Sequence, residues 1–384
     1  MMPSRGRFVV MLSSFLLMAA CAPATPPSAG ISTEGDWKTR WEGTLASARQ
    51  EGKVVVNTNT SLYYREMLNG FAEKYPEIQV EHVPMRPSEF APKAITEQQN
   101  GIFGYDAMIS ATGNMAEVLL PANAFDKITP YLILPEVTEA SNWRGGQLLY
   151  GSYEPYILLN RGNVNGEIVV NRQVLPKSEF NSIEQLWDPK WKGQITIRNP
   201  SAPHNATNFL TGVLHAKGEQ AVWKLLWEQE PVYTENARLL SENVIRGKYP
   251  IALGIETATF ENCRVNKGCD HMEEISGPKH VLGHGGTVLR NPPHPAAAAV
   301  LINWFFSKEG QEAFKQAIIA TTAGPYVDAH SARKDVEPHP DAVKAGNVPD
   351  YDNLKQYSLQ GMEQGAGEMK AVIEMWKKVE AQRR

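Results

Sequence analysis

Hydroxyl and amide side chains gather in three short segments of the first half of the chain, residues 57–61, 85–88 and 110–114. Such groups donate and accept hydrogen bonds, and the guanidinium of Arg86 can make a two-pronged contact with a phosphate or carboxylate. This chemistry suits recognition of a small polar ligand that carries a negative group. The candidate ligand-binding residues in these segments are Asn57, Thr58, Asn59, Thr60, Arg86, Ser110, Thr112 and Asn114.

The second half of the chain adds further candidates, and most of them directly follow apolar runs. They are Arg198, Asn199 and Ser201 after residues 195–197, Glu256 and Thr257 after residues 251–255, and Tyr153 near residues 150–160. Arg198 and Arg86 can hold an anion from two sides, Glu256 can accept from a sugar hydroxyl or pair with an amine, and Tyr153 can stack on a ring. Simpler roles stay open: a helix cap for Thr60, a solvated charge for Arg86, an ion pair for Glu256 and packing for Tyr153.

Enzyme motifs are absent from the sequence, which contains no G-x-S-x-G, no H-E-x-x-H and no G-x-x-x-x-G-K-[ST]. His284 beside Glu256 would make an acid–base pair, but no nucleophile stands in a recognisable setting. We therefore predict a binding protein that is not an enzyme and that has no cofactor and no resident metal.

The elements that position these residues alternate between helix and strand. Apolar residues at helical spacing predict a helix from Trp37 that Gly52 ends, then a strand over residues 54–56. A helix containing Tyr64 follows, with a strand over residues 78–83, and a third helix capped by Ser88 leads to a strand over 105–110. This β-α-β-α-β order predicts a parallel sheet, whose strand carboxyl ends are the usual place for a ligand.

Length and charge limit the remaining possibilities. A chain of 384 residues is longer than one core usually supports, so we expect two domains. The formal net charge is −4 and there is no block of Lys and Arg, which argues against a nucleic-acid partner. Residues 353–384 are predicted to form a helix that packs on the body.

The first residues resemble a bacterial lipoprotein signal. Arg5 and Arg7 precede an apolar run over residues 8–17, and small residues lead to Cys21, the residue that is acylated in such signals. Residues 1–20 are then a signal peptide, with residues 21–35 a flexible linker. The resemblance implies a protein exported and held by lipid at a bacterial membrane, its body in the periplasm or on the extracellular face.

With Cys21 assigned to lipid, Cys263 and Cys269 remain, and an exported compartment allows them to form a disulfide. A zinc site is the competing interpretation, but it needs at least two more ligands and only His271 lies near in the sequence.

Longer segments resemble the bacterial extracellular solute-binding proteins of ABC importers. The segments are IEQLWDPKWKGQI at 183–195, INWFFSKEGQEA at 302–313, GKYPIA at 247–252 and AEKYP at 72–76. The resemblance implies an α/β, two-lobed type II periplasmic binding protein fold, each lobe a mostly parallel sheet with flanking helices, joined by two crossover strands. Lobe I would comprise residues 36–155 and 288–384, and lobe II residues 156–287. The implied partners are a small-molecule ligand and a permease in the cytoplasmic membrane, and we expect a monomer.

The branch of that family which this chain resembles includes ferric, sugar-phosphate, phosphonate and thiamine binders. Its ferric members hold iron through adjacent tyrosines after the strand that here ends at Ile255, where this chain reads ETATF. Tyr63 and Tyr64 are adjacent, but they lie at the start of a helix where Tyr64 belongs to the apolar face. We therefore predict an anionic organic solute. Iron held by Glu256 and a bound anion, and a lipid-anchored ligand sensor for a membrane kinase, are the alternatives.

Overall fold

The computed structural model describes residues 35–150, 153–255, 263, 268–322, 328–344, 347–349, 351 and 359–383. The predicted signal peptide, Cys21, Glu256 and Thr257 lie outside these ranges. Within them, no helix has the length and apolar character needed to cross a bilayer.

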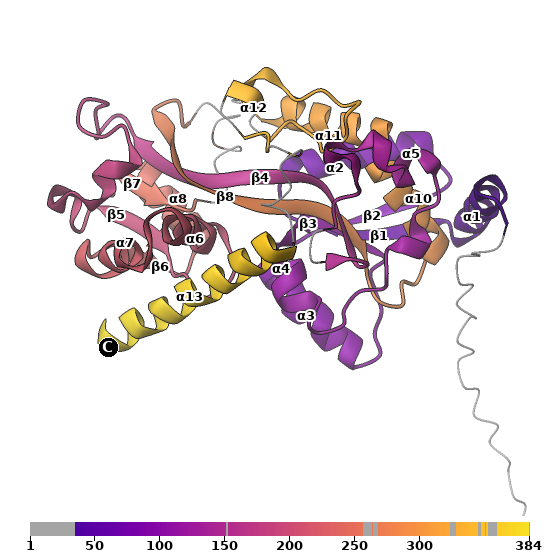
Figure 1. The fold of residues 1–384 in the computed structure, drawn as a ribbon, viewed down its shortest axis with the longest axis horizontal. Coiled ribbons are helices and arrows are strands. Elements are labelled where there is room, and N and C mark those ends of the chain that lie inside the picture. The colour runs from indigo at the N-terminus through magenta and orange to yellow at the C-terminus, as the bar shows by residue number, and fades with distance from the viewer. Residues whose placement is uncertain are drawn as a thin grey trace, which may run out of the picture.

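Eight strands are hydrogen-bonded in the order β2-β1-β3-β8-β4-β7-β5-β6. Their bounds are β1 Lys53–Thr58, β2 Gln79–Pro84, β3 Ala107–Ala111, β4 Ile157–Asn171, β5 Ile195–Arg198, β6 Val232–Thr234, β7 Ile251–Leu253 and β8 Met272–Val288. In one lobe β1 pairs in parallel with β2 and β3, and in the other β5 pairs in parallel with β6 and β7. The long strands β4 and β8 pair antiparallel and run from one lobe into the other (Figure 1). The predicted two-lobed α/β fold with two crossover strands is confirmed.

Helices flank both halves of this sheet. In the first lobe they are α1 Trp37–Glu51, α2 Leu62–Lys74, α3 Pro87–Gln99, α4 Thr112–Asn114, α5 Pro135–Thr138, α10 Pro295–Phe306, α11 Lys308–Thr321 and α12 Pro340–Lys344. In the second they are α6 Asn205–Lys217, α7 Glu219–Trp223, α8 Ala237–Ile245 and α13 Leu359–Arg383. Among the described residues there are also short helical turns: η1 Met115–Leu119, η2 Thr129–Tyr131, η3 Ala140–Asn142, η4 Arg144–Gly146, η6 Ile183–Trp187, η7 Pro189–Trp191 and η8 Lys224–Glu228.

Local chemistry explains where the helices near the site begin and end. The Asp36 carboxylate accepts from two backbone N–H groups at the start of α1, and Gly52 ends that helix with a φ of 67°. Helix α3 begins differently from the prediction, because Arg86 rather than Ser88 is its N-cap residue and Pro87 is its first helical residue. Proline suits that position because the N–H it lacks would have no partner within the helix.

Two large apolar cores lie at opposite ends of the crossover strands, one in each lobe. The first includes Val56, Phe71 and Ile302, and the second includes Ile197 and Phe209. The first core combines residues from an early and a late part of the chain, and the second core holds residues that lie between them in the sequence.

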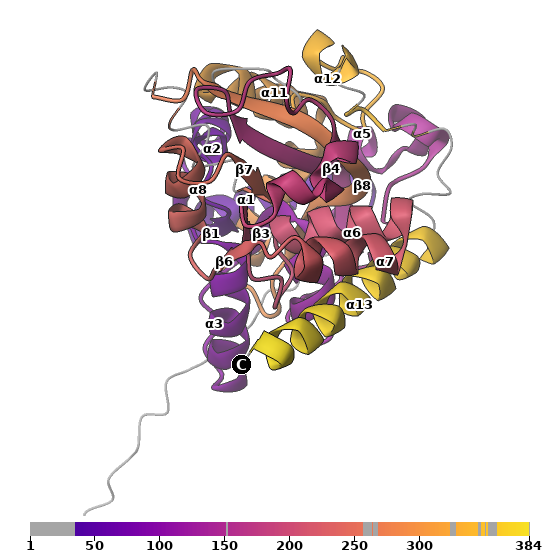
Figure 2. The same ribbon diagram turned by 90° about the vertical axis from the view of Figure 1, so that its left-hand side faces the viewer.

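Helix α13 packs on the second lobe, whereas the sequence analysis places residues 288–384 in lobe I. Its residues Val372, Met375, Trp376 and Val379 recur at helical spacing and are buried in the second core. Figures 1 and 2 show the helix lying beside α6. Burial of this apolar stripe holds the end of the chain against lobe II.

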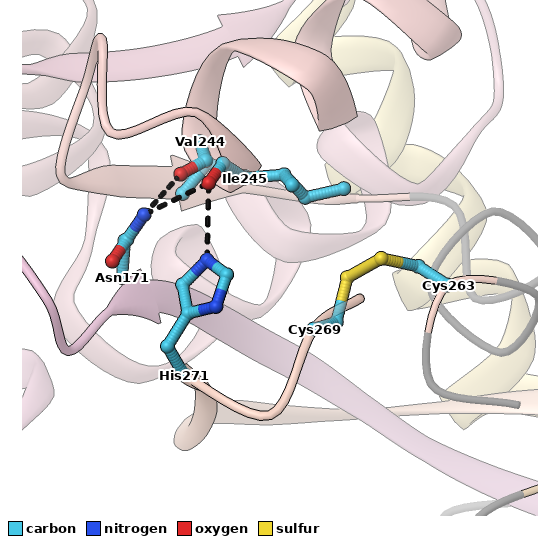
Figure 3. Close-up of a disulfide and its surroundings, with 6 residues drawn as sticks. All are labelled: Asn171, Val244, Ile245, Cys263, Cys269 and His271. Carbon is cyan, nitrogen blue, oxygen red and sulfur yellow. Dashed lines mark hydrogen bonds between the residues drawn. A yellow bond between two sulfur atoms is a disulfide. The ribbon is translucent and has the colours of Figure 1, made fainter. Parts of the chain in front are cut away.

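The predicted disulfide between Cys263 and Cys269 is present, with the two Cα atoms 5.5 Å apart (Figure 3). His271 is the nearest imidazole in the sequence. Its Nε2 makes a hydrogen bond of 3.0 Å to the carbonyl oxygen of Ile245 and not to the sulfur atoms.

The backbones of β4 and β8 approach closely near the lobe I end of the pair. Leu159 pairs with Gly285 and Arg161 with His284, so the register shifts by one residue at Asn160. A Cβ atom added at Gly285 would lie 2.2 Å from the carbonyl oxygen of Leu158 in β4. This close approach of two backbones requires glycine.

We expect Gly285→Ala to lower the free energy of unfolding by about 1–3 kcal/mol or more, because the added methyl overpacks the crossover pair. Chemical denaturation measures the change. Gly104→Ala is the matched control, since nothing lies within 4 Å of a Cβ atom there and its stability should be unchanged. Equal stability of the two variants would contradict the close approach.

Candidate functional site

A cavity of about 170 Å³ lies where the two lobes and the crossover strands meet. Its walls come from the segments after β1, β2 and β3 in lobe I, from the β5–α6 connection in lobe II, and from β4 and β8. Six predicted site residues line it together: Asn59, Thr60, Arg86, Ser110, Asn114 and Arg198.

The lobe I wall is built around helix N-termini. The side-chain oxygen of Asn59 accepts from the backbone N–H of Ser61, 2.8 Å away, which fixes the turn into α2. Arg86 begins α3, and its Nη1 lies 3.2 Å from a carboxylate oxygen of Glu89 one turn along. Ser110 is fully buried at the end of β3, and among the described residues its Oγ has no hydrogen-bond partner.

The lobe II wall is formed by Arg198, at the end of β5, and by the residues that open α6. His204 donates from Nε2 to the carbonyl oxygen of Asn199, 2.8 Å away, so the neutral ring carries its lone pair on Nδ1. That Nδ1 is buried and has no partner in the part of the chain that the structure describes. Burial and the nearby charge of Arg198 lower the pKa of His204 to about 4.

A direct hydrogen bond joins the two walls. The side-chain amide of Asn114, in lobe I, donates to the carbonyl oxygen of Pro203, in lobe II, over 3.2 Å. The two lobes therefore touch at the edge of the cavity.

The floor of the cavity belongs to the crossover strands. His284 on β8 is bonded on both ring nitrogens, through Nδ1 to the side-chain oxygen of Asn160, 2.8 Å away, and through Nε2 to the hydroxyl of Tyr64. The amide oxygen of Asn160 only accepts, so Nδ1 carries the proton and Nε2 accepts from Tyr64. Complete burial lowers the pKa of His284 well below its usual range. The ring is neutral.

Three of the predicted residues turn into the protein instead of the cavity. The side-chain amide of Asn57 donates to a β2 carbonyl 2.9 Å away, and Thr58 lies 2.7 Å from the Nε2 of His82. Thr112 donates to the carbonyl oxygen of Gly283, 3.0 Å away on the crossover strand. These side chains hold the sheet edge on which the cavity is built.

Three more predicted residues also lie away from the cavity lining. The side-chain amide of Asn199 donates to the carboxylate of Glu235 over 2.6 Å, Ser201 is exposed, and Tyr153 packs against the lobe I core. Glu256 and Thr257 lie outside the described residues.

The cavity also contains residues that the sequence analysis did not select as site residues. Tyr63, Arg161, His204, His284 and Asp328 all line it. Arg161 and His284 sit inside long strands, where only the register of the β4·β8 pair decides which side chains face the cavity. His204 stands in a polar segment between a strand and a helix, and that placement is the one signal that was available.

The charges around the cavity favour an anion. Among the described residues, the charged ones that line it are Arg86, Arg161, Arg198 and Asp328, three positive groups against one negative. The two lining histidines are neutral. Within the described ranges, no three His, Cys, Asp or Glu side chains converge as a metal site would require.

No family model matches the chain. A Haemophilus influenzae protein described as "Uncharacterized protein" is 28% identical over 155 residues, which is 38% of this chain and 44% of that protein. The match therefore spans less than half of that relative's length.

Solved structures match far more of the chain. Iron-bound HitA from Pseudomonas aeruginosa covers 85% of it with a TM-score of 0.60 and 18% identity, and 99% of HitA is matched. The periplasmic binding protein AfuA from Actinobacillus pleuropneumoniae, with fructose-6-phosphate bound, covers 84% with a TM-score of 0.61 and 16% identity, and 99% of AfuA is matched. Trichodesmium IdiA (FutA) with iron and citrate covers 85% with a TM-score of 0.58 and 15% identity, and 99% of that chain is matched. The fold is that of periplasmic binding proteins.

We expect the lining histidines to stay neutral between pH 7 and pH 5, while His294 titrates above its usual range. A hydrogen bond from the His294 ring to Asp106, over 2.8 Å, raises the pKa of His294. Histidine-selective NMR measures all three titrations, and protonation of His204 above pH 6 would contradict the buried geometry.

The same shifts fix the sign of two contributions to stability. His204 binds a proton near pH 6.5 in the unfolded chain but only near pH 4 in the folded chain. Between these values the unfolded chain binds more protons, so the free energy of unfolding falls as the pH falls from 6.5 to about 4. The contribution of His294 is present below pH 6.5 and is lost as the pH rises through its raised pKa.

Proposed function

We propose that the protein is the extracytoplasmic solute-binding receptor of an ABC importer. It captures a small polar anionic organic solute in the cavity between its lobes and delivers it to a permease in the membrane. The observation that carries the proposal is a single cavity in which arginines from lobe I, lobe II and a crossover strand meet.

The lining supports an anionic ligand with further polar groups. Arginine presents a rigid fork of N–H donors that matches phosphate and carboxylate oxygens. The lone pair of His204 Nδ1 adds an acceptor for a ligand hydroxyl, while Asn59 and Thr60 offer further hydrogen-bonding groups. A cavity of about 170 Å³ limits the solute to a small molecule.

The similar structures agree with this class of cargo. AfuA has fructose-6-phosphate bound, and Trichodesmium IdiA (FutA) has iron and citrate. A sugar phosphate and citrate are both hydroxylated organic anions. Iron is the alternative cargo, since HitA is also iron-bound.

Two lobes around a shared pair of strands supply a capture mechanism. The ligand contacts groups of both lobes, so it stabilises the form in which the lobes are closed over it more than the open form. The permease then distinguishes loaded from empty receptor by the relative position of the lobes.

We expect Arg86→Ala and Arg198→Ala each to weaken binding of the anionic ligand about 10- to 150-fold, the loss of about 1.5–3 kcal/mol from a charged hydrogen bond. Native mass spectrometry of the purified protein identifies retained ligand, and calorimetry with that compound measures its affinity. Arg65→Ala and Arg238→Ala are matched controls, because both side chains are exposed and neither lines the cavity.

Two results would contradict the proposal. Unchanged affinity in both cavity variants would remove the arginine clamp. Stoichiometric iron in the purified protein, without an organic anion, would replace the solute with a metal cargo.

Export and anchoring form the second element of the proposal: residues 1–20 act as a signal peptide and Cys21 carries lipid. The disulfide between Cys263 and Cys269 agrees with an oxidising compartment.

We expect wild-type protein to incorporate labelled fatty acid and to fractionate with membranes, because an acyl chain on Cys21 partitions into lipid. Cys21→Ser should lose the label and appear in the soluble fraction. Cys263→Ser is the control and should keep the label. Membrane association of unlabelled Cys21→Ser would contradict the anchor.

A further inference from the structure

Arg161 is a fully buried residue of the cavity lining. It lies on the crossover strand β4 opposite His284, at the register shift of the β4·β8 pair. Its side chain is only 1% exposed, yet it lines the cavity together with Arg86 and Arg198. A guanidinium this deeply buried needs its charge and its N–H groups compensated.

The contacts of Arg161 compensate it incompletely. Its Nη1 donates to the backbone carbonyl of Asp328, but the Asp328 carboxylate is 3.8 Å away, beyond the usual hydrogen-bond distance. The guanidinium stacks 5.0 Å from the ring centre of Phe314, which holds its plane. Its Nε is buried and has no partner among the residues that the structure describes.

A second buried arginine, Arg333, shows what full compensation looks like in this chain. It is also 1% exposed and also lies over an aromatic ring, that of Trp143, at 5.7 Å. Its Nε and Nη2 bind both carboxylate oxygens of Asp335, at 2.8 and 2.9 Å, and its Nη1 donates to two backbone carbonyls. Arg333 lines no part of the cavity, so it has a structural role that Arg161 does not share.

Ser110 is a second, independent sign of a ligand site. It is fully buried at the end of β3, lines the same cavity as Arg161, and its Oγ is among the buried atoms without a hydrogen-bond partner within the described ranges. Buried polar atoms in native proteins nearly always have a partner. A ligand with anionic oxygens would supply one to both side chains.

We propose that Arg161 is the anchor for the anionic group of the ligand, and that Asp328 is its resident counter-ion, with which that anionic group competes. This inference rests on the proposed function and adds to it the residue that selects for negative charge. The carboxylate of Asp328 keeps the empty site from carrying an isolated buried cation. It also repels an incoming anion, so the pair limits affinity while it maintains the fold.

The place of Arg161 on a shared strand separates it from the other two arginines. Arg86 belongs to lobe I and Arg198 to lobe II, so both reach one ligand only when the lobes approach. Arg161 belongs to the strand that connects the lobes and is in place before they close.

The experiment measures the affinity of three variants for inorganic phosphate, citrate and fructose 6-phosphate by calorimetry, with thermal melts as the test of folding. We expect Arg161→Lys to weaken binding at least about tenfold, because lysine lacks the fork and the Nε–H. We expect Asp328→Asn to tighten binding several-fold, because it removes the competing charge. Arg333→Lys, the matched control, should lower the melting temperature and leave the affinity unchanged.

The outcomes separate this inference from the proposed function. Wild-type protein that binds none of the three anions would overturn both. Weaker binding in Arg86→Ala and Arg198→Ala with unchanged binding in Arg161→Lys would overturn the anchor alone. If Arg161→Lys does not fold, Asp328→Asn decides: tighter binding supports the competition, and unchanged or weaker binding overturns it.

Discussion

The pairing of β4 with β8 runs from one lobe of the molecule into the other, and each lobe's parallel strands attach to it at opposite ends. Near the lobe I end of the pair Gly285 lets the two backbones approach, and the register shifts at Asn160. The same short stretch carries Arg161 and His284, which form the floor of the cavity. The strand pair that joins the lobes therefore also supplies two of the side chains that line the cavity.

Burial decides which side chains of the cavity lining carry a positive charge. His204 and His284 are held neutral by desolvation, so they offer hydrogen bonds without adding positive charge. Arginine keeps its proton in the same environment because its intrinsic pKa is so high. Among the described lining residues the positive groups are thus Arg86, Arg161 and Arg198, and a guanidinium pairs with anionic oxygens through its planar fork of donors.

The sequence predicted those helices and strands whose local residue pattern is enough to specify their secondary structure. The strand 54–56 is a run of three valines and the helix containing Tyr64 has an apolar period, and the two appear as β1 and α2. Strand β8 was not predicted, because its glycines and polar residues lack the alternation of a strand and are held by pairing with β4. Candidate residues in loops could be chosen by type, but which of them face the cavity depends on contacts such as that of Thr112 with Gly283. Arg161 could be assigned to the cavity only from the register of the β4·β8 pair.

The three arginines differ in what their contacts can accomplish. A ligand shifts an equilibrium between open and closed lobes only by the difference in its affinity for the two forms. In the proposed mechanism, an anchor on the connecting strand contacts the ligand in both forms, so Arg161 contributes affinity without favouring closure. Arg86 and Arg198 line the cavity from different lobes, so in the same mechanism a ligand that contacts both of them favours closure. A receptor that must signal its loaded state to a permease needs both kinds of contact, because affinity alone retains the solute but leaves the lobes where they were.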